Sequence, residues 1–199
     1  HVYPYRLGAF VQDKLEFQGF IANLGIRLDY SNPNGEDYNL GVYDPFFSQG
    51  LGRMIELNAP KEKAQSQTYV SPRIGISHPI TEDSKLYFNY GHYVSEPSSS
   101  MRFRLQRESN GLVTYMGNPN MLFEKTISYE LGFEQNLRDQ FLVNIAAYYK
   151  DVTHQPGWIY YQNINTSVHY YDAASNNYAD IRGFEVTLTK VGRSWIGGF

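Results

Sequence analysis

The stretch NLGIRLDY, residues 23–30, alternates without a break between apolar and polar side chains. Leu24, Ile26 and Leu28 fall on one side of an extended chain, and Arg27 and Asp29 fall on the other. Successive side chains of a β-strand point to opposite faces, so this pattern predicts a strand with one apolar and one charged face. In a soluble sheet the apolar face would cover a core, whereas in a membrane barrel it would meet lipid.

The same alternation recurs six more times along the chain. Including the first stretch, the predicted strands cover residues 5–17, 23–30, 69–78, 85–93, 126–134, 141–150 and 181–190. Strands of roughly ten residues are longer than the usual five or six of soluble sheets. Tilted near 45°, such a strand rises about 23 Å, which matches the apolar band of about 25 Å on an outer-membrane barrel.

The connections between these strands alternate between short and long. Short segments join the first strand to the second (QGF), the third to the fourth (PITEDS) and the fifth to the sixth (QNLRDQ). The other connections are long and span residues 31–68, 94–123 and 151–178. This order is typical of an up-and-down barrel with tight turns on one side of a membrane and long loops on the other. We therefore predict an all-β fold, an antiparallel transmembrane β-barrel wall of about seven strands.

The alternation also predicts which side chains share a face. Those predicted to face lipid are Leu24, Ile26, Leu28, Ile127, Tyr129, Leu131, Val143 and Ile145. Those predicted to face the lumen are Arg27, Asp29, Arg73, Glu130, Glu134, Asn144, Lys150 and Glu185. A soluble sheet that turns its charged face to water remains the alternative; strand length and loop asymmetry together favour the membrane.

Composition narrows the possible classes of protein. The net charge of −3 is spread without a basic cluster, which argues against a nucleic-acid partner. The absence of cysteine excludes a disulfide scaffold and a thiolate metal site. No apolar run approaches the roughly 20 residues of a spanning helix, so a membrane form would span as strands. The chain opens HVYPYRLGAF without a signal peptide, so we expect a mature form or a piece of one.

Several segments together resemble a known family. In order, AFVQDKLEF, NLGIRLDY, SPRIGISHPITEDSKLYFNYGHY, GNPNMLFEKTISYELGFEQNL, NIAAYYKDV and YADIRGFEVTL resemble barrel strands of TonB-dependent outer-membrane receptors. The nearest type is that of the Bacteroidetes, which carries a carboxypeptidase-regulatory-like domain. The resemblance implies that residues 1–199 are part of a 22-strand barrel. The plug domain and the TonB-contacting segment of such receptors have no counterpart in this stretch.

Two details depart from the family pattern. Receptors of this kind usually have Asn-Pro-(Asn/Asp)-Leu-Lys-Pro-Glu before a strand, whereas here Met121, Leu122 and Phe123 replace Leu-Lys-Pro. The change removes a fixed φ but leaves the fold expectation intact. The chain ends SWIGGF, whose two glycines do not suit a terminal barrel strand, so we expect Phe199 to be a point of interruption.

Catalytic and metal-binding patterns are weak. The histidines His1, His78, His92, His154 and His169 lie in separate segments without metal-ligand spacing. Glu130 and Glu134 are about 13 Å apart along a strand, too far for a paired-carboxylate glycosidase. We therefore expect no enzyme activity, no metal and no cofactor.

The third long connection is the best candidate for ligand binding. It combines aromatic side chains with amides, a mixture that suits a sugar, peptide or chelate. The candidate ligand-binding residues are Trp158, Tyr160, Tyr161, Tyr170 and Tyr171. The alternative is that these rings form an aromatic girdle or pack loop against loop. Arg102, Arg104 and Arg107 could face lipopolysaccharide phosphates or an anionic ligand, but a solvated run of charges is the more ordinary interpretation.

These observations leave three functional hypotheses. The resemblance implies a receptor in the Gram-negative outer membrane that imports a scarce ligand with energy from TonB. The expected partners are the plug, the remaining strands, the TonB complex, lipid, and a small ligand such as a siderophore, cobalamin, oligosaccharide or peptide. A passive porin or adhesive barrel would share the alternation without needing a plug. A soluble carbohydrate-binding domain is the third possibility.

Overall fold

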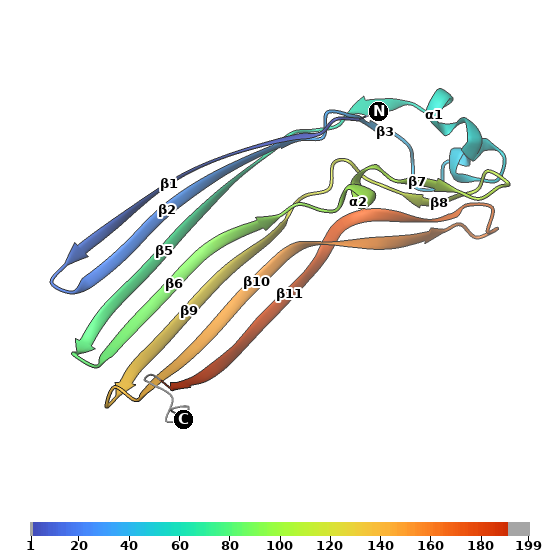
Figure 1. The fold of residues 1–199 in the computed structure, drawn as a ribbon. Coiled ribbons are helices and arrows are strands. Elements are labelled where there is room, and N and C mark those ends of the chain that lie inside the picture. Colours follow the sequence, from blue (N-terminus) through green and yellow to red (C-terminus); the bar gives the residue numbers. More distant parts are fainter. Residues whose placement is uncertain (1, 191–199) are drawn as a thin grey trace, which may run out of the picture.

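The seven predicted strands are confirmed in the computed structural model, which describes residues 2–190. His1 and the predicted interruption at Phe199 lie outside the described residues. The long strands are β1 (Tyr5–Phe17), β2 (Phe20–Asn32), β5 (Gln67–Thr81), β6 (Ser84–Ser95), β9 (Glu124–Leu137), β10 (Phe141–Gln162) and β11 (His169–Lys190). Each is antiparallel to the next in one curled, open sheet (Figure 1). Within residues 2–190, no helix is long and apolar enough to cross a membrane.

The pairing registers confirm the predicted division of side chains between two faces. Leu28 pairs with Val70, Ile74 with Tyr90, and Tyr129 with Tyr149, so one apolar face crosses the strands. Arg27 pairs with Ser71 and Asn89 with Glu130, which continues the polar face. All of the charged residues predicted to share a face do so, because the pairing between neighbouring long strands places them directly opposite, or an even number of residues away from, one another.

The connections lie where the alternation predicts them. The short turns gather at one end of the sheet and every long connection lies at the other (Figure 1). The first turn places Gln18 and Gly19 at φ 46° and 81°, and the third places Arg138 and Asp139 at 54° and 57°. Positive φ at both central residues gives a turn whose twist matches that of the flanking strands.

The long connections fold into a second region, which we call the loop layer (residues 33–66, 96–123 and 153–178). The rest of the long strands form the strand wall. The short elements of the loop layer are β3 (Glu36–Tyr38), η1 (Pro45–Phe47), η2 (Leu51–Met54), α1 (Ile55–Asn58), β4 (Lys61–Lys63), α2 (Ser99–Phe103), β7 (Leu105–Arg107) and β8 (Val113–Met116). β3 pairs with β4, and β7 pairs with β8, which runs parallel to β11 at Tyr171 and Asp172.

The prediction that residues 151–178 form a loop is wrong. β10 and β11 continue through this region as a hairpin, and only residues 163–168 connect them. Register shifts fall between Val152 and Gln155 and between Gln155 and Gly157, where His154 has a φ of 57°. A bulge adds a residue to one strand and changes the phase of its side chains, so the alternation is interrupted although the strand continues. Pro156 at this place is consistent with a bulge, since proline cannot donate to a ladder.

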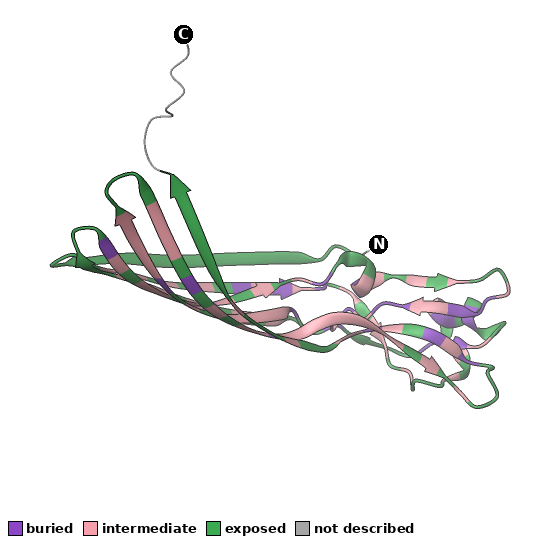
Figure 2. Ribbon diagram, turned by 90° about the horizontal axis from the view of Figure 1, so that it is seen from below, coloured by how far each residue is buried: buried purple, intermediate pink, exposed green. Residues whose placement is uncertain are grey.

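Most of the buried apolar side chains lie in the loop layer (Figure 2). One cluster joins Phe47, Ile55 and Ala59 of the first connection to Val113 and Met116 of the second and to Val168 and Tyr170 of the hairpin. The three long connections therefore pack on one another and form a small core at one end of the sheet.

Candidate functional site

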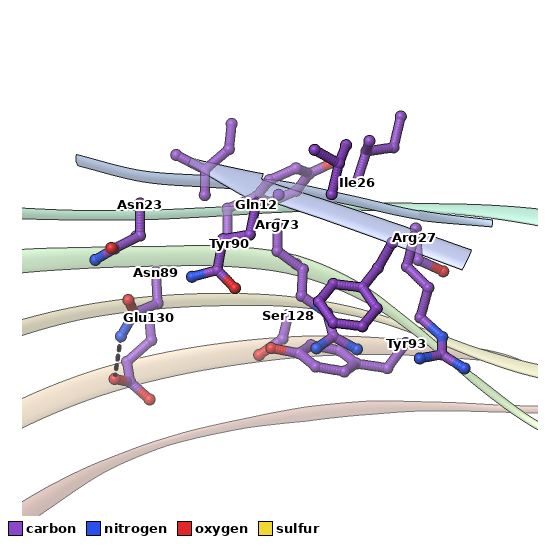
Figure 3. A pocket seen from close by; sticks show the side chains of 17 residues that line it. Gln12, Asn23, Ile26, Arg27, Arg73, Asn89, Tyr90, Tyr93, Ser128 and Glu130 are labelled. Atoms are coloured by element: carbon purple, nitrogen blue, oxygen red, sulfur yellow. Dashed lines mark hydrogen bonds between the residues drawn. The ribbon is translucent and has the colours of Figure 1, made fainter. Parts of the chain in front are cut away.

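The polar face of the sheet is hollowed by two cavities of about 450 and 220 Å³. The larger is lined by polar side chains of five strands, among them Gln12, Asn23, Arg73, Asn89 and Glu130 (Figure 3). Asn89 donates to Glu130 at 3.1 Å. Cavities on this face indicate that it is the concave side of the curled sheet.

An ion-pair network connects this face to the loop layer. Arg6 donates to Asp29 at 2.9 Å, and Arg27 donates to both carboxylate oxygens of Asp29 at 2.8 and 2.9 Å. Asp29 is only 1% exposed, so two guanidinium groups compensate its burial. Beyond it, Glu96 lies 3.9 Å from Arg6 and accepts from the buried Arg102. Burial lowers the pKa of Arg102, but the Glu96 carboxylate stabilises its charged guanidinium.

The turn formed by Asn118, Pro119 and Asn120 fastens the loop layer together. The Asn120 amide donates to Asp37 at 2.8 Å, and its Oδ1 accepts from the backbone N–H of Gln65 at 2.7 Å. The Pro119 carbonyl accepts from Arg102 at 3.4 Å. The family signature retained at these positions therefore acts as a structural clasp between the first and second connections.

The departure from the family pattern has a physical explanation at Phe123. Its side chain is fully buried and stacks on Tyr69 at a centroid distance of 4.9 Å. Its backbone N–H donates to the Tyr69 hydroxyl at 2.9 Å. Proline at this position could not make that hydrogen bond, so phenylalanine replaces a fixed φ with a stack and a hydrogen bond.

The structure divides the five candidate aromatic residues between the two faces of the hairpin. Tyr161 and Tyr170 lie on one face, where Tyr170 is 3% exposed, stacks on Phe47 at 4.2 Å and donates to the Val42 carbonyl at 2.9 Å. These two rings pack the hairpin against the first connection. Burial and nearby carboxylates raise the pKa of the Tyr170 hydroxyl, which therefore stays neutral.

The other three candidates form an aromatic group on the opposite face. Tyr171 stacks on Tyr115 at 5.1 Å and lies 5.0 Å from Tyr160. Trp158 meets Tyr115 edge-on at 5.1 Å. Tyr160 and Tyr171 are exposed, and Trp158 is half-buried. This open group can offer ring faces to a ligand.

The three arginines of the second connection have three different environments. Arg102 is buried against Glu96, and Arg107 donates to Glu56 and to the Gly52 carbonyl. Arg104 lies over the Tyr115 ring at 4.6 Å. Only Arg104 therefore adjoins the open aromatic group, and the three do not form one anion-binding run.

A carboxyl group is buried where the hairpin meets the first connection. Desolvation raises the pKa of Asp172 to about 6, and the charge of Asp37 adds to the effect. The pKa of Asp37 is raised as well, mainly by burial. Two carboxyl groups with raised pKa values thus lie near each other in the loop layer.

Sequence reasoning missed several residues of these sites. Arg6, Ser71 and Tyr93 lie in phase with the polar face, so the alternation could have located them. Glu96 and Tyr115 lie in the long connections, where no period indicates contacts. Among residues 2–190, no group of three or more His, Cys, Asp or Glu side chains could hold a metal ion.

A family model supports the architecture over nearly the whole chain. The model for the TonB dependent receptor-like β-barrel matches residues 3–198. A comparison with curated proteins found no match.

Solved structures of similar fold are longer proteins. A double mutant of the Serratia marcescens hemophore receptor HasR, in complex with its hemophore HasA and heme, has a TM-score of 0.71 and 16% identity over 95% of this chain and 32% of that one. The copper transporter OprC has a TM-score of 0.58 and 18% identity over 93% and 26%. The ferric-catecholate import receptor Fiu from E. coli K12 has a TM-score of 0.56 and 14% identity over 94% and 25%. The chain spans about a third or less of these structures, and identities this low show the fold alone.

Proposed function

Because this chain belongs to the TonB dependent receptor-like β-barrel family, we propose that it is part of the barrel wall of an outer-membrane receptor. The receptor captures a scarce extracellular ligand and imports it with energy from TonB. The observation that carries the proposal is the mainly apolar face that the seven long strands share, combined with the placement of every long connection at one end. In this proposal the long connections are extracellular and the short turns are periplasmic.

The proposal assigns the apolar face to lipid and the polar face to the barrel interior. Leu131, Ile145 and Leu28 are exposed, at 52%, 46% and 47%, and contact with lipid would cover them. Spin labels at the neighbouring positions Ile145 and Asn144 test this orientation in the full-length receptor. We expect oxygen to relax the first label and a water-soluble nickel chelate to relax the second. Equal accessibility to both reagents would contradict the assignment.

Uptake in cells tests the transport mechanism. We propose to offer cells that carry the full-length receptor labelled heme, copper and a ferric catecholate, the ligands of the structural neighbours, together with cobalamin. Uptake through a TonB-driven receptor stops when the TonB protein is deleted or the proton-motive force is collapsed. Uptake that continues in both cases would favour the passive porin instead.

The aromatic group of Trp158, Tyr160 and Tyr171 is the proposed capture surface, with Arg104 and Tyr115 beside it. Ring faces of this kind contribute about 0.5–1.5 kcal/mol each beyond burial. Changing Trp158 and Tyr171 together to alanine should therefore weaken capture about tenfold or more, with assembly intact. The matched control is Tyr161→Phe, which keeps the packed ring on the other face of the hairpin. If the double variant captures ligand as well as the parent does, the ligand binds at another place on the receptor.

A further inference from the structure

The two cavities of the polar face meet at the same four side chains. Arg27, Ser71, Arg73 and Tyr93 line both the larger and the smaller cavity. They come from β2, β5 and β6, and Figure 3 shows Arg73 and Tyr93 close together within the larger one. The meeting point is therefore built by three adjacent strands of the wall.

Positive charge exceeds negative charge at this point. The smaller cavity is lined by three arginines, Arg6, Arg27 and Arg73, but by one carboxylate, Asp29. Asp29 already accepts hydrogen bonds from Arg6 and Arg27. Arg73 has no ion pair with any described residue of the chain, and its guanidinium lies over the Tyr93 ring at 4.7 Å. Its donors are thus available to a further anion.

A second observation indicates a missing acceptor at the same place. The Ser71 hydroxyl is buried, at 1% exposure, and has no hydrogen-bond partner among the described residues. Ser71 pairs with Arg27 and lies on the polar face. A buried polar group without a partner is costly, so a hydroxyl left in this state favours a ligand that accepts a hydrogen bond from it.

A glycine on the next strand leaves room for the ring that supports Arg73. A Cβ at Gly91 would lie 3.0 Å from the Tyr93 hydroxyl oxygen and 3.1 Å from two of its ring carbons. A side chain at position 91 would therefore push the Tyr93 ring away from its place against the backbone of β6. The ring in turn supports the guanidinium of Arg73 through its π face.

We propose that Arg73, Arg27 and Ser71 form an anion-binding site in the barrel wall that takes a carboxylate group. The planar guanidinium fork matches the two oxygens of a carboxylate, as Arg27 and Asp29 already demonstrate. The carboxylate comes either from a free polycarboxylate in the interior or from an acidic side chain of a protein segment that fills it. The inference rests on the proposed orientation of the polar face toward the interior and is independent of TonB.

Calorimetry on the full-length receptor in detergent tests the free anion, with sodium citrate as the probe at constant ionic strength. Arg73→Gln should weaken citrate binding about tenfold or more, since one charge-assisted contact is lost. Arg73→Lys should retain part of the affinity. Ser71→Ala should weaken binding less, without lowering thermal stability, because the methyl group needs no partner. The matched control is Arg138→Gln in a short turn, which should bind citrate like the parent.

A carboxylate from the protein itself would give a different result. The parent would then bind no citrate, and Arg73→Gln and Ser71→Ala would both lower the melting temperature and speed proteolysis of the interior segment relative to Arg138→Gln. Arg73→Lys would restore part of the loss. If Arg73→Gln does not assemble, Ser71→Ala alone is compared with Arg138→Gln in citrate affinity, melting temperature and proteolysis. The site is refuted if both variants match Arg138→Gln in citrate affinity, melting temperature and proteolysis, whatever the uptake assays show.

Discussion

In the strand wall the most deeply buried side chains are polar, with Asp29, Ser31 and Ser71 at 2% exposure or less, whereas the loop layer buries Ile55 and Val113 completely. The wall leaves its apolar side chains on the outside, and the loop layer encloses its own. One chain thus follows two rules of burial, an inverted one where we propose that it meets lipid and the ordinary one where it meets water. The variants below test whether the two regions are energetically distinct.

The largest effect is expected from a charge on the apolar face of the wall. Leu131→Arg should destabilise the assembled barrel by roughly 2–4 kcal/mol, because a lipid-facing arginine near the membrane centre must leave water. Urea titration of the full-length receptor in vesicles, followed by heat-modifiable gel mobility, measures the change.

The neighbouring polar position provides the control for this variant. Glu130→Gln should change the urea midpoint little, because the residue faces the cavity. Equal losses at the two positions would show that the wall has no lipid-facing side.

A core substitution in the loop layer should act locally. Ile55→Ala removes a completely buried side chain and should cost about 2 kcal/mol, at the low end for such changes because a small core can relax. Hydrogen exchange should rise in residues 39–59 and 105–116, with no change in β6 or β9. Faster exchange throughout the strand wall would show that the two regions unfold as one.

The buried carboxyl group gives the loop layer a pH dependence that the wall should lack. The folded pKa of Asp172 is raised from 3.8 to about 6, so the folded state binds the proton more tightly than the unfolded state does. Stability of the loop layer should therefore fall by about 1–3 kcal/mol as pH rises from about 4 through 6, and then level off.

Asp172→Asn should remove most of this slope. Hydrogen exchange at the tips of β10 and β11, corrected for the intrinsic pH dependence, measures it. A loop layer that becomes more stable across the same range would contradict the assignment.

The smallest effect is expected from an ion pair on the polar face. Lys85 and Glu134 lie 2.7 Å apart across β6 and β9, but both are partly open to the cavity side. Lys85→Gln should shift the unfolding free energy by less than about 0.5 kcal/mol, since such pairs gain little in water. A loss comparable to that of Leu131→Arg would indicate that this side of the wall is not hydrated.

The wall could be predicted from the sequence because its rule is periodic. The two-residue alternation of apolar and polar side chains located all seven long strands. The lengths of the connections placed the long ones at one end of the sheet. The period also fixed the shared face of Arg27, Arg73 and Glu130, since one slipped residue would invert a strand.

The loop layer could not be predicted in this way, because its contacts join distant residues without a period. The bulge near His154 broke the phase of β10 and concealed its continuation. The burial of Tyr170 depends on Phe47, more than a hundred residues earlier in the chain, and the sequence between them contains no sign of that contact. Composition could select the aromatic residues of the hairpin but not the face on which each one lies.

The bulge between Val152 and Gly157 also has a mechanical consequence. β10 and β11 each run for 22 residues, about 70 Å if fully extended, and bend over the other connections after this point (Figure 1). The bulge therefore acts as a pivot between a longer arm, residues 141–152 of β10, which is anchored in the sheet, and a shorter arm that ends at the hairpin tip. A force applied at the tip would act on the packing of Tyr170 against Phe47 and on the pairing of β11 with β8, because both contacts hold the free arm against the loop layer. Loosening both contacts would free the arm without straining the ladder between β9 and β10, which ends at Thr153.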